Sequence, residues 1–256
     1  MPVPLAQLGV QLIGAMEFRP PAIGGLDGTR WTIPDDVEGG CGAAEFAGRT
    51  CYGSFGRPNK ATATNDGYLG HIIEVGHYSV LEHGVVSLYI TGVSRSLTHE
   101  LIRHRHLSPS QLSQRYVDAA DTAFVMPPEI VGNPVLEEKF HAACEAALAH
   151  YEDLRDALDV ELADVPDRTA RRKRSRQAAR SVLPNSVATE IVLTGNYRAW
   201  RHFIRMRASA AADVEIRALA IAVLDLLQRH APNAFSDFTI VEQADGTRTA
   251  WTSAHE

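Results

Sequence analysis

A strand and a helix follow each other directly in the stretch SVATEIVLTGNYRAWRHFIRMRA, residues 186–208. The first nine residues predict a strand, Gly195 and Asn196 predict a turn, and the remaining residues have the periodicity of a helix. Strands and helices mix along the rest of the chain without a regular β–α–β pattern. We therefore predict an α+β fold, in which a mixed or antiparallel sheet packs with long helices in a single domain over residues 1–256.

Further strands and helices are predicted on both sides of this stretch. Leu8, Val10 and Leu12 stand on alternate positions and predict a strand, whereas Ser94 is a typical N-cap for a helix that continues to residue 104. The longest predicted helix has Asn133 as its N-cap and Pro134 in its first turn, and its apolar residues recur every three or four positions for about seven turns. The other predicted elements are helices over 65–77, 169–182, 197–208 and 214–230, and strands over 85–93 and 235–241.

Three segments are expected to lack this regularity. Residues 18–48 are rich in Gly and Pro and predict an excursion over the surface. Residues 106–116 are polar, contain Pro109 and predict a loop. The dipeptide Asp245-Gly246 predicts a hairpin in a C-terminal segment over 242–256.

The distribution of charge indicates an anionic ligand. The chain of 256 residues has a net charge of −6, with only three Lys (Lys60, Lys139 and Lys173) among 25 basic residues. Residues 168–207 carry a local charge of +10, so the rest of the chain carries −16. Such an asymmetry is typical of a protein that holds an anion on one part of an otherwise acidic molecule.

Cysteine usage and the absence of apolar runs predict a cytoplasmic protein. Cys41, Cys51 and Cys144 form no metal-ligand pair such as CxxC, and their odd number argues against a disulfide framework. The first residues lack the basic start and apolar run of a signal peptide, and no apolar stretch approaches the ~20 residues that cross a bilayer. We expect no membrane partner.

Several ionisable side chains leave a predicted helix end together in RHRHLSPSQLSQRY, residues 103–116, which we call the signature stretch. Arginine forks bind phosphate oxygens in a bidentate manner, and hydroxyl and amide groups add directional contacts. The same residues would also suit a solvated helix C-terminus, where cations offset the helix dipole. The residues alone favour neither interpretation.

The helix after Asn196 places an arginine among apolar residues. Arg207 falls about 180° from Arg198 on the helical wheel, in the middle of the apolar face. A solvated basic face accounts for Arg201 and Arg205, but not for Arg207. A guanidinium cannot lose its proton, so on a buried face it needs either a structural ion pair or an anionic ligand. Position alone slightly favours the ion pair over an electrophilic role.

Two other functional classes remain open at this point. The basic helix RTARRKRSRQAARSVL, residues 168–183, could bind nucleic acid, although the net charge opposes this and only Arg180 is placed to face inward. Six of the eleven histidines lie between positions 71 and 106, which could indicate a metal-dependent hydrolase. However, His99 and His104 are five residues apart and cannot share a metal as the histidines of HExxH do. Ser113 lacks the GxSxG context of a hydrolase nucleophile.

The signature stretch resembles a known pattern. Arg103, His104 and Arg105, followed after seven residues by Ser113 and then by Arg115-Tyr116, resemble the motif of the flavin-dependent thymidylate synthases. Four further segments resemble actinobacterial members of this family: GHYSVLEH (76–83), TGVSRSLTHELIRHRH (91–106), RQAARSVLPN (176–185) and TGNYRAWRHFIRMRAS (194–209).

The resemblance implies a reaction and its cofactors. Members of the family transfer a methylene group from methylenetetrahydrofolate to dUMP and reduce it to the methyl group of dTMP. NADPH supplies the hydride through FAD, so that tetrahydrofolate is released, and no metal is required. The resemblance also implies the family fold and a homotetramer whose active sites are shared between subunits, with no nucleic acid as partner.

Site residues follow from the resemblance, position by position. The resemblance gives Arg207 the catalytic role of stabilising the ionised uracil, and it places His77 near the flavin ring. Ser113 is assigned to substrate binding, and the family often has Asn and Glu where this chain has Ser110 and Gln111. The implied FAD-binding residues are Ser79, Arg103, His104, Arg105, Gln111, Asn196, Tyr197, Arg198 and His202. The implied dUMP-binding residues are Glu100, Leu101, Ile102, Arg103, Gln111, Leu112, Ser113, Gln114, Arg115, Arg180 and Arg207.

Overall fold

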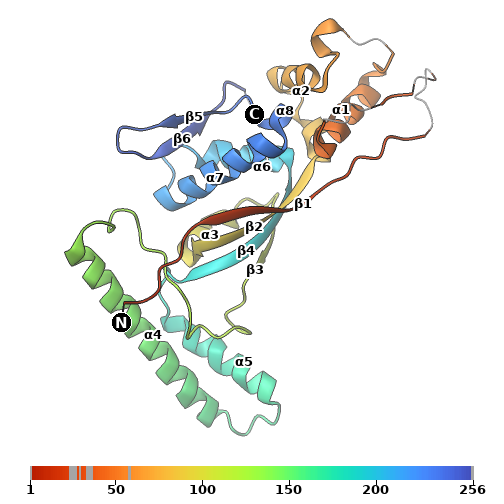
Figure 1. Cartoon of the computed structure of the whole chain (residues 1–256). Coiled ribbons are helices and arrows are strands. Elements are labelled where there is room, and N and C mark those ends of the chain that lie inside the picture. The colour runs from red at the N-terminus through yellow and green to blue at the C-terminus, as the bar shows by residue number, and fades with distance from the viewer. Residues whose placement is uncertain (1, 23–27, 29, 33–36, 57–58, 255–256) are drawn as a thin grey trace. The chain divides into compact units, whose positions relative to one another are not determined.

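The computed structural model confirms an α+β architecture with many of the predicted elements (Figure 1). It describes residues 2–22, 28, 30–32, 37–56 and 59–254. In these residues the strands are β1 (Gly9–Ala15), β2 (Val85–Ser94), β3 (Ser108–Gln111), β4 (Ala188–Asn196), β5 (Thr239–Glu242) and β6 (Arg248–Trp251). The helices are α1 (Gly39–Tyr52), α2 (Asn65–Glu74), α3 (Arg95–Leu101), α4 (Pro134–Glu161), α5 (Arg168–Ala179), α6 (Tyr197–Arg207), α7 (Val214–His230) and α8 (Pro232–Phe235).

Two sheets and two compact units organise the chain. The larger sheet has the strand order β1-β2-β4-β3, and β5 pairs with β6 in an antiparallel hairpin. Unit 1 comprises residues 1–9, 90–103 and 110–192, and unit 2 comprises residues 10–89, 104–109 and 193–256. Each strand of the larger sheet therefore supplies residues to both units.

Unit 1 is built on the paired helices α4 and α5, which lie side by side (Figure 1). The predicted N-cap is confirmed, because Asn133 Oδ1 accepts hydrogen bonds from the backbone N–H groups of Val135 and Leu136. Only Cys144 and Tyr151 of the 28 residues of α4 are buried. Phe140 and Leu158 of α4 are partly buried and pack against this core, whereas Leu136 and Leu154 are exposed.

Unit 2 is built around α6 and α7, with the β5–β6 hairpin against α7. Trp200, Phe203 and Ile204 of α6 are fully buried, as the helical wheel predicted. Asn196 ends β4 and caps α6, since its Oδ1 accepts a hydrogen bond of 2.8 Å from the N–H of Ala199. The predicted hairpin at Asp245-Gly246 is confirmed by the pairing of β5 with β6. In the described part of the chain, no helix is long and apolar enough to cross a membrane.

The predicted surface excursion over 18–48 ends in a buried helix, which corrects the interpretation of its glycines. Helix α1 begins at Gly39, where the Glu38 carboxylate accepts hydrogen bonds from the N–H groups of Gly40 and Cys41. A Cβ on Gly40 would collide with the ring of Tyr197, so this glycine permits close packing instead of a turn. The parts of the excursion at 23–27, 29 and 33–36 lie outside the described residues.

Two further boundaries differ from the prediction. Within the expected loop over 106–116, Ser108–Gln111 form strand β3, which pairs with β4 at the edge of the sheet. Proline is tolerated in an edge strand, so Pro109 does not prevent this pairing. The strand was not predicted because its residues show no alternation of apolar and polar side chains. The strand expected over 235–241 begins only at Thr239, because residues 232–235 form the short helix α8.

Arg201 is completely buried, although its position predicted a solvated basic face. Its guanidinium donates hydrogen bonds of 2.6 and 2.7 Å to the two carboxylate oxygens of Asp237, and a third to the carbonyl of Ala234. It also lies 4.8 Å from the centroid of the Phe238 ring. Burial alone would raise the pKa of Asp237, but the hydrogen bonds and charge of Arg201 outweigh it and lower that pKa. The side of α6 that contains Arg201 therefore faces protein and not solvent.

We expect Asp237→Ala to lower the free energy of unfolding by about 3 kcal/mol, because Arg201 would stay buried without its carboxylate. Urea denaturation measures the loss. Asp225→Ala is the matched control, since it removes a partly exposed ion pair with Arg248 in the same unit and should cost less than about 1 kcal/mol. Equal losses for the two variants would contradict the burial of the Arg201–Asp237 pair.

Candidate functional site

A basic hollow opens beside the first turns of α6 in unit 2. It has a volume of about 360 Å³ and is lined by Glu82, His106, Asn196, Arg198, Ala199, His202 and Arg205. The α6 residues among them recur every three or four positions, so they share one side of the helix. Three of the residues predicted to bind FAD thus come together here: Asn196, Arg198 and His202.

The geometry of this hollow follows from the junction between β4 and α6. Strand β4 ends at Asn196, and its capping hydrogen bond starts the helix at that point. The N–H groups of Tyr197 and Ala199 already donate to the Gly84 carbonyl and to Asn196 Oδ1, so it is the dipole of α6 that favours negative charge at this end. Arg198 adds a cation whose Nη1 donates to Glu82 Oε1 over 2.6 Å, with both side chains about half exposed. The hollow therefore suits an anionic group, such as a phosphate.

Arg207 and His104 form a direct pair in unit 2. Arg207 Nε donates a hydrogen bond of 2.9 Å to His104 Nε2, and His104 packs edge-on against the ring of Phe203 at 5.2 Å. Burial, the charge of Arg207 and the neighbouring His202 together lower the pKa of His104 to about 4. The imidazole is therefore neutral near pH 7, with its proton on Nδ1, and serves as an acceptor for the guanidinium.

The other residues of unit 2 that were predicted to bind FAD differ in exposure. Arg105 and Ser79 are exposed. Tyr197 is fully buried, its hydroxyl donates to Glu38 Oε2 over 2.6 Å, and burial raises its pKa above the ordinary range. Its side chain therefore belongs to the core, next to the N-terminus of α1. His77 is exposed, and its Nδ1 is 2.7 Å from the Tyr52 hydroxyl.

A second group of predicted residues lies in unit 1. Gln111 Nε2 donates to Thr98 Oγ1 over 3.1 Å, and Ser113 Oγ accepts from the N–H of Arg115 over 3.3 Å. The Nε atom of Arg115 is buried and has no hydrogen-bond partner among the described residues. A buried donor without a partner is costly, and an anionic ligand would satisfy it.

Arg95 also belongs to this group, although the sequence did not single it out. Its Nη2 donates to the Leu112 carbonyl over 2.7 Å, and its pKa is lowered by burial and by the charge of Arg180. The positive charge of Arg180 thus acts on Arg95, and an anion would relieve this repulsion. Arg95 follows the helix cap Ser94 directly, so its place was visible in the sequence, but its distance from Arg180 was not.

The remaining residues that were predicted to bind dUMP differ in how far they are buried. Leu101 is only 1% exposed, so its side chain is part of the core. Ile102 and Arg103 are exposed, Glu100 is half-buried, and Gln114 and Leu112 line a small hollow with Arg95. Among the residues predicted to bind dUMP, those from 111 to 115 are all partly buried.

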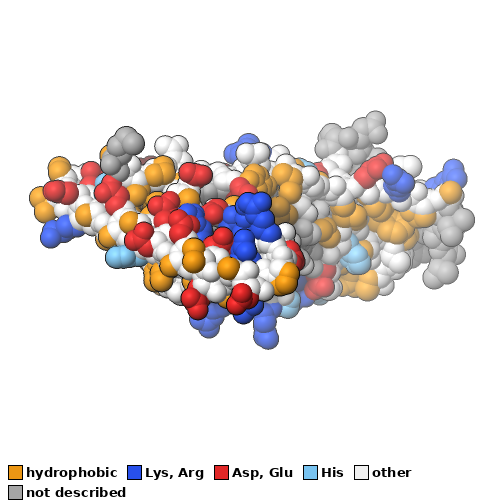
Figure 2. All heavy atoms as spheres, turned by 90° about the horizontal axis from the view of Figure 1, so that it is seen from below, with side chains coloured by type: hydrophobic (Ala, Val, Ile, Leu, Met, Phe, Trp, Pro, Cys, Tyr) orange, Lys and Arg blue, Asp and Glu red, His pale blue; other side chains and the backbone are white. Residues whose placement is uncertain are grey.

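Several cations of the basic helix α5 have partners within the protein. Arg171 pairs with Asp159 of α4, Arg176 pairs with Asp118, and Lys173 donates to the Tyr116 hydroxyl. On the face drawn in Figure 2, Lys and Arg side chains lie among Asp and Glu side chains and form no continuous basic track. Within the part of the chain that the structure describes, no group of three His, Cys, Asp or Glu side chains could hold a metal ion.

The chain is thus an α+β protein that gathers arginine side chains at two places, one in each unit. A family model described as thymidylate synthase complementing protein matches residues 35–233. The chain is 57% identical over 246 residues to a flavin-dependent thymidylate synthase of Mycolicibacterium vanbaalenii, covering 96% of both chains. It is 55% identical to those of Mycobacterium avium and Mycobacterium tuberculosis, covering 96% of this chain and 96% and 95% of theirs. The chain therefore belongs to the flavin-dependent thymidylate synthases, the enzyme family that the signature stretch predicted.

We expect the His104 imidazole to titrate with a pKa of about 4. Arg207→Gln should raise this pKa, because a neighbouring cation is removed, while burial keeps it below the ordinary value of 6.5. Histidine-selective NMR titration measures both values, and Arg229→Gln, an exposed change on α7, should leave them unaltered.

The same pKa predicts a pH dependence of stability. Because the pKa of His104 is lower in the folded chain than in the unfolded one, protonation favours unfolding. The contribution of the neutral imidazole is complete above pH 6.5 and is lost as the pH falls toward 4. A His104 that titrates near 6.5 in the unmodified protein would contradict both expectations.

Proposed function

We propose that this enzyme converts dUMP to dTMP, with methylenetetrahydrofolate as carbon donor and NADPH as the source of the hydride. Bound FAD would take up the hydride of NADPH and, once reduced, would pass it to the transferred methylene group, so that tetrahydrofolate would be released. Family membership is the observation that carries the proposal. The two arginine-rich groups support it, because both dUMP and FAD present phosphates.

The residues around the basic hollow fit a flavin dinucleotide. Asn196 and Arg198 at the start of α6 would hold an anionic part of FAD, and His202 lies one turn further on the same side. Arg103, His104 and Arg105 would contact the cofactor by analogy with the family motif. Tyr197 would act indirectly, since its buried hydroxyl holds the start of α6 against Glu38. When bound, FAD would supply the hydride-transfer chemistry.

The group in unit 1 fits the phosphate of dUMP. The unsatisfied Nε of Arg115 would find its acceptor there, and Arg95 and Arg180 would add the charge that a dianionic phosphate requires. The amide of Gln111 donates to Thr98 of α3, and the Ser113 hydroxyl accepts from the N–H of Arg115. The remaining donors and acceptors of both groups would bind the ligand.

Arg207 would stabilise the negative charge that develops on the uracil ring during the reaction. The neutral His104 accepts from Nε and so fixes the plane of the guanidinium without neutralising its charge. A charged donor held in a fixed orientation acts more strongly on a developing anion than a mobile one does. This arrangement explains why an arginine stands among the apolar residues of α6.

We further propose a cytoplasmic homotetramer in which each chain is one family domain. The exposed apolar residues of α4, including Val135, Leu154 and Val160, support a subunit interface on this helix. Sedimentation or mass photometry measures the assembly directly.

We expect formation of dTMP to require all four components: dUMP, methylenetetrahydrofolate, NADPH and FAD. The purified protein should be yellow, and added dUMP should perturb the flavin absorption band. A tritium-release or dTMP assay in which each component is omitted in turn measures the requirement. Protein that cannot be loaded with FAD, or turnover that persists without dUMP, would refute the proposal.

We expect Arg207→Lys to keep FAD binding but to lose about 100-fold or more of the rate of dTMP formation, because lysine cannot reproduce the planar guanidinium. Flavin absorbance after gel filtration and kcat measure the two properties. Arg229→Lys, a control at an exposed position of α7, should behave as the unmodified enzyme. A near-normal kcat for Arg207→Lys would exclude the electrophilic role.

A further inference from the structure

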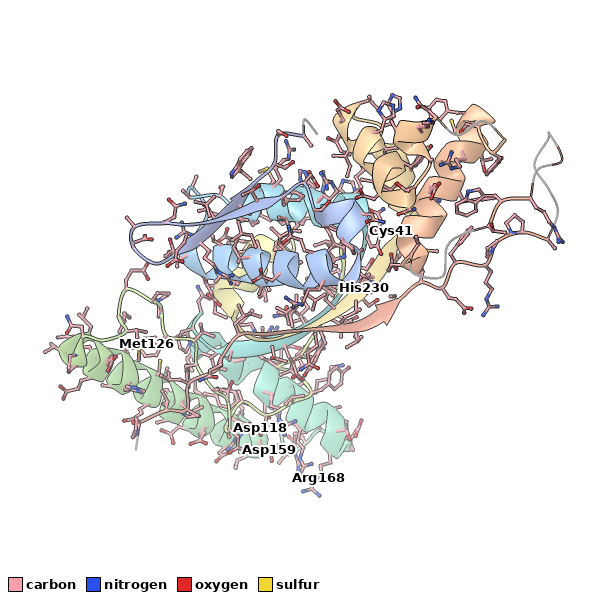
Figure 3. The ribbon with its side chains drawn as sticks, turned by 45° about the horizontal axis from the view of Figure 1, so that its top comes forward. Cys41, Asp118, Met126, Asp159, Arg168 and His230 are labelled. Atoms are coloured by element: carbon pink, nitrogen blue, oxygen red, sulfur yellow. The ribbon has the colours of Figure 1, made fainter. Side chains whose placement is uncertain are left out.

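Asp118 lies two residues after the signature stretch and between helices α4 and α5 of unit 1. Figure 3 labels it close to Asp159, on the side where the two helices approach each other. The family motif does not include it, but it lines the small hollow that Arg95, Leu112 and Gln114 also line. Its side chain is one-third exposed, so it is a polar junction at the surface of the unit and not part of the core.

One carboxylate joins three segments of the chain at this point. Asp118 Oδ1 accepts hydrogen bonds of 3.0 Å from the Tyr151 hydroxyl and from Arg155 Nη1, both on α4. Asp118 Oδ2 accepts from Arg176 Nη2 of α5 over 3.1 Å. Oδ1 also accepts from the N–H of Ala120 over 3.3 Å. The carboxylate therefore joins one guanidinium and one phenol of α4 to one guanidinium of α5.

The same side chains hold the backbone that leaves the signature stretch. Arg176 Nη1 donates to the Tyr116 carbonyl over 2.6 Å, so one guanidinium bridges Tyr116 and Asp118. The Tyr151 hydroxyl accepts from the N–H of Ala119 over 3.2 Å. The chain from 116 to 120 is thus fixed to both helices by side-chain contacts.

This network sets the position of two parts of the group in unit 1. Residues 111–115 precede the fixed segment directly, so their path depends on where residue 116 is held. Arg180 follows Arg176 by four residues, so the Asp118–Arg176 pair also fixes the helix that leads to Arg180. A loop without these contacts would lose more conformational entropy on binding a phosphate than the loop that they already hold in place.

We propose that Asp118 is a positioning residue for nucleotide binding, which holds residues 111–115 and Arg180 in the arrangement that receives the phosphate of dUMP. This inference rests on the proposed function, which assigns those residues to dUMP. Asp118 acts through Arg176, Tyr151 and Arg155, which donate hydrogen bonds to its carboxylate. Burial raises the pKa of Asp118, but the hydrogen bonds from Arg155 and Tyr151 outweigh it, so the carboxylate is charged at neutral pH.

The test compares Asp118→Asn with Asp156→Asn in the full-length enzyme loaded with FAD. Asp156 is a matched control, because it accepts from the same Arg155 over 2.8 Å and lines, together with Asp118, a hollow between α4 and α5. Among the described residues, its side chain forms no hydrogen bond with residues 116–120. We expect Asp118→Asn to raise both the KM and the Kd for dUMP about tenfold, with kcat changed less than threefold. The KM for NADPH and the retention of FAD should not change.

If Asp118 had a purely structural role, its substitution would change dUMP binding, NADPH binding, FAD retention and kcat together, or would change none of them. If the KM and Kd for dUMP of Asp118→Asn lie within twofold of those of Asp156→Asn, the inference is overturned. If Asp118→Asn does not fold, Tyr151→Phe is the deciding variant, because it removes one hydrogen-bond donor to Asp118 and keeps the buried ring. A rise of about threefold in the Kd for dUMP supports the inference, and an unchanged Kd overturns it. Unmodified enzyme that does not bind dUMP would instead overturn the proposed function.

Discussion

Helix α6 places arginines on several sides, and each guanidinium needs an acceptor on its own side because it cannot lose its proton. Arg198 finds Glu82, Arg201 finds Asp237 and Arg207 finds His104. The acceptors come from three separate parts of unit 2, so satisfying this one helix requires those parts to be in place together. Asn196 then fixes where the helix begins and hence the direction of every one of these side chains.

The C-terminal hairpin also depends on this helix. The N–H of Ala250 donates to the carbonyl of Ala208, the residue directly after Arg207, over 2.8 Å. Thr252 Oγ1 donates to Asp237, the partner of the buried Arg201. The hairpin therefore satisfies a carbonyl at the end of α6 and supports the acceptor of its buried cation. Both contacts restrict the motion of the segment that ends at Arg207.

The sequence was sufficient where local chemistry determines structure. The caps at Ser94 and Asn133, the turn at Gly195 and Asn196 and the hairpin turn each depend on residues within a few positions of one another, and all were predicted. Arg201 was misjudged because a helical wheel separates polar from apolar side chains but does not show whether protein or solvent lies beyond the polar side. The glycines of α1 were misjudged for a similar reason, since close packing against Tyr197 depends on a residue more than 150 positions away. Arg95 and Asp118 escaped notice because only the fold brings their partners close.

Ion pairs within the protein explain much of the excess positive charge over residues 168–207. A protein that binds a nucleic acid polymer keeps its cations exposed, so that they can displace counterions along a backbone. On α5, however, Arg171 and Arg176 are already paired with Asp159 and Asp118, which places their charge inside the protein's own network. The cations that point to a ligand are few and partly buried, as with Arg115 and Arg95. A small number of oriented, partly dehydrated guanidiniums suits a compact dianion, and the excess of arginine over lysine is consistent with that requirement for a planar donor.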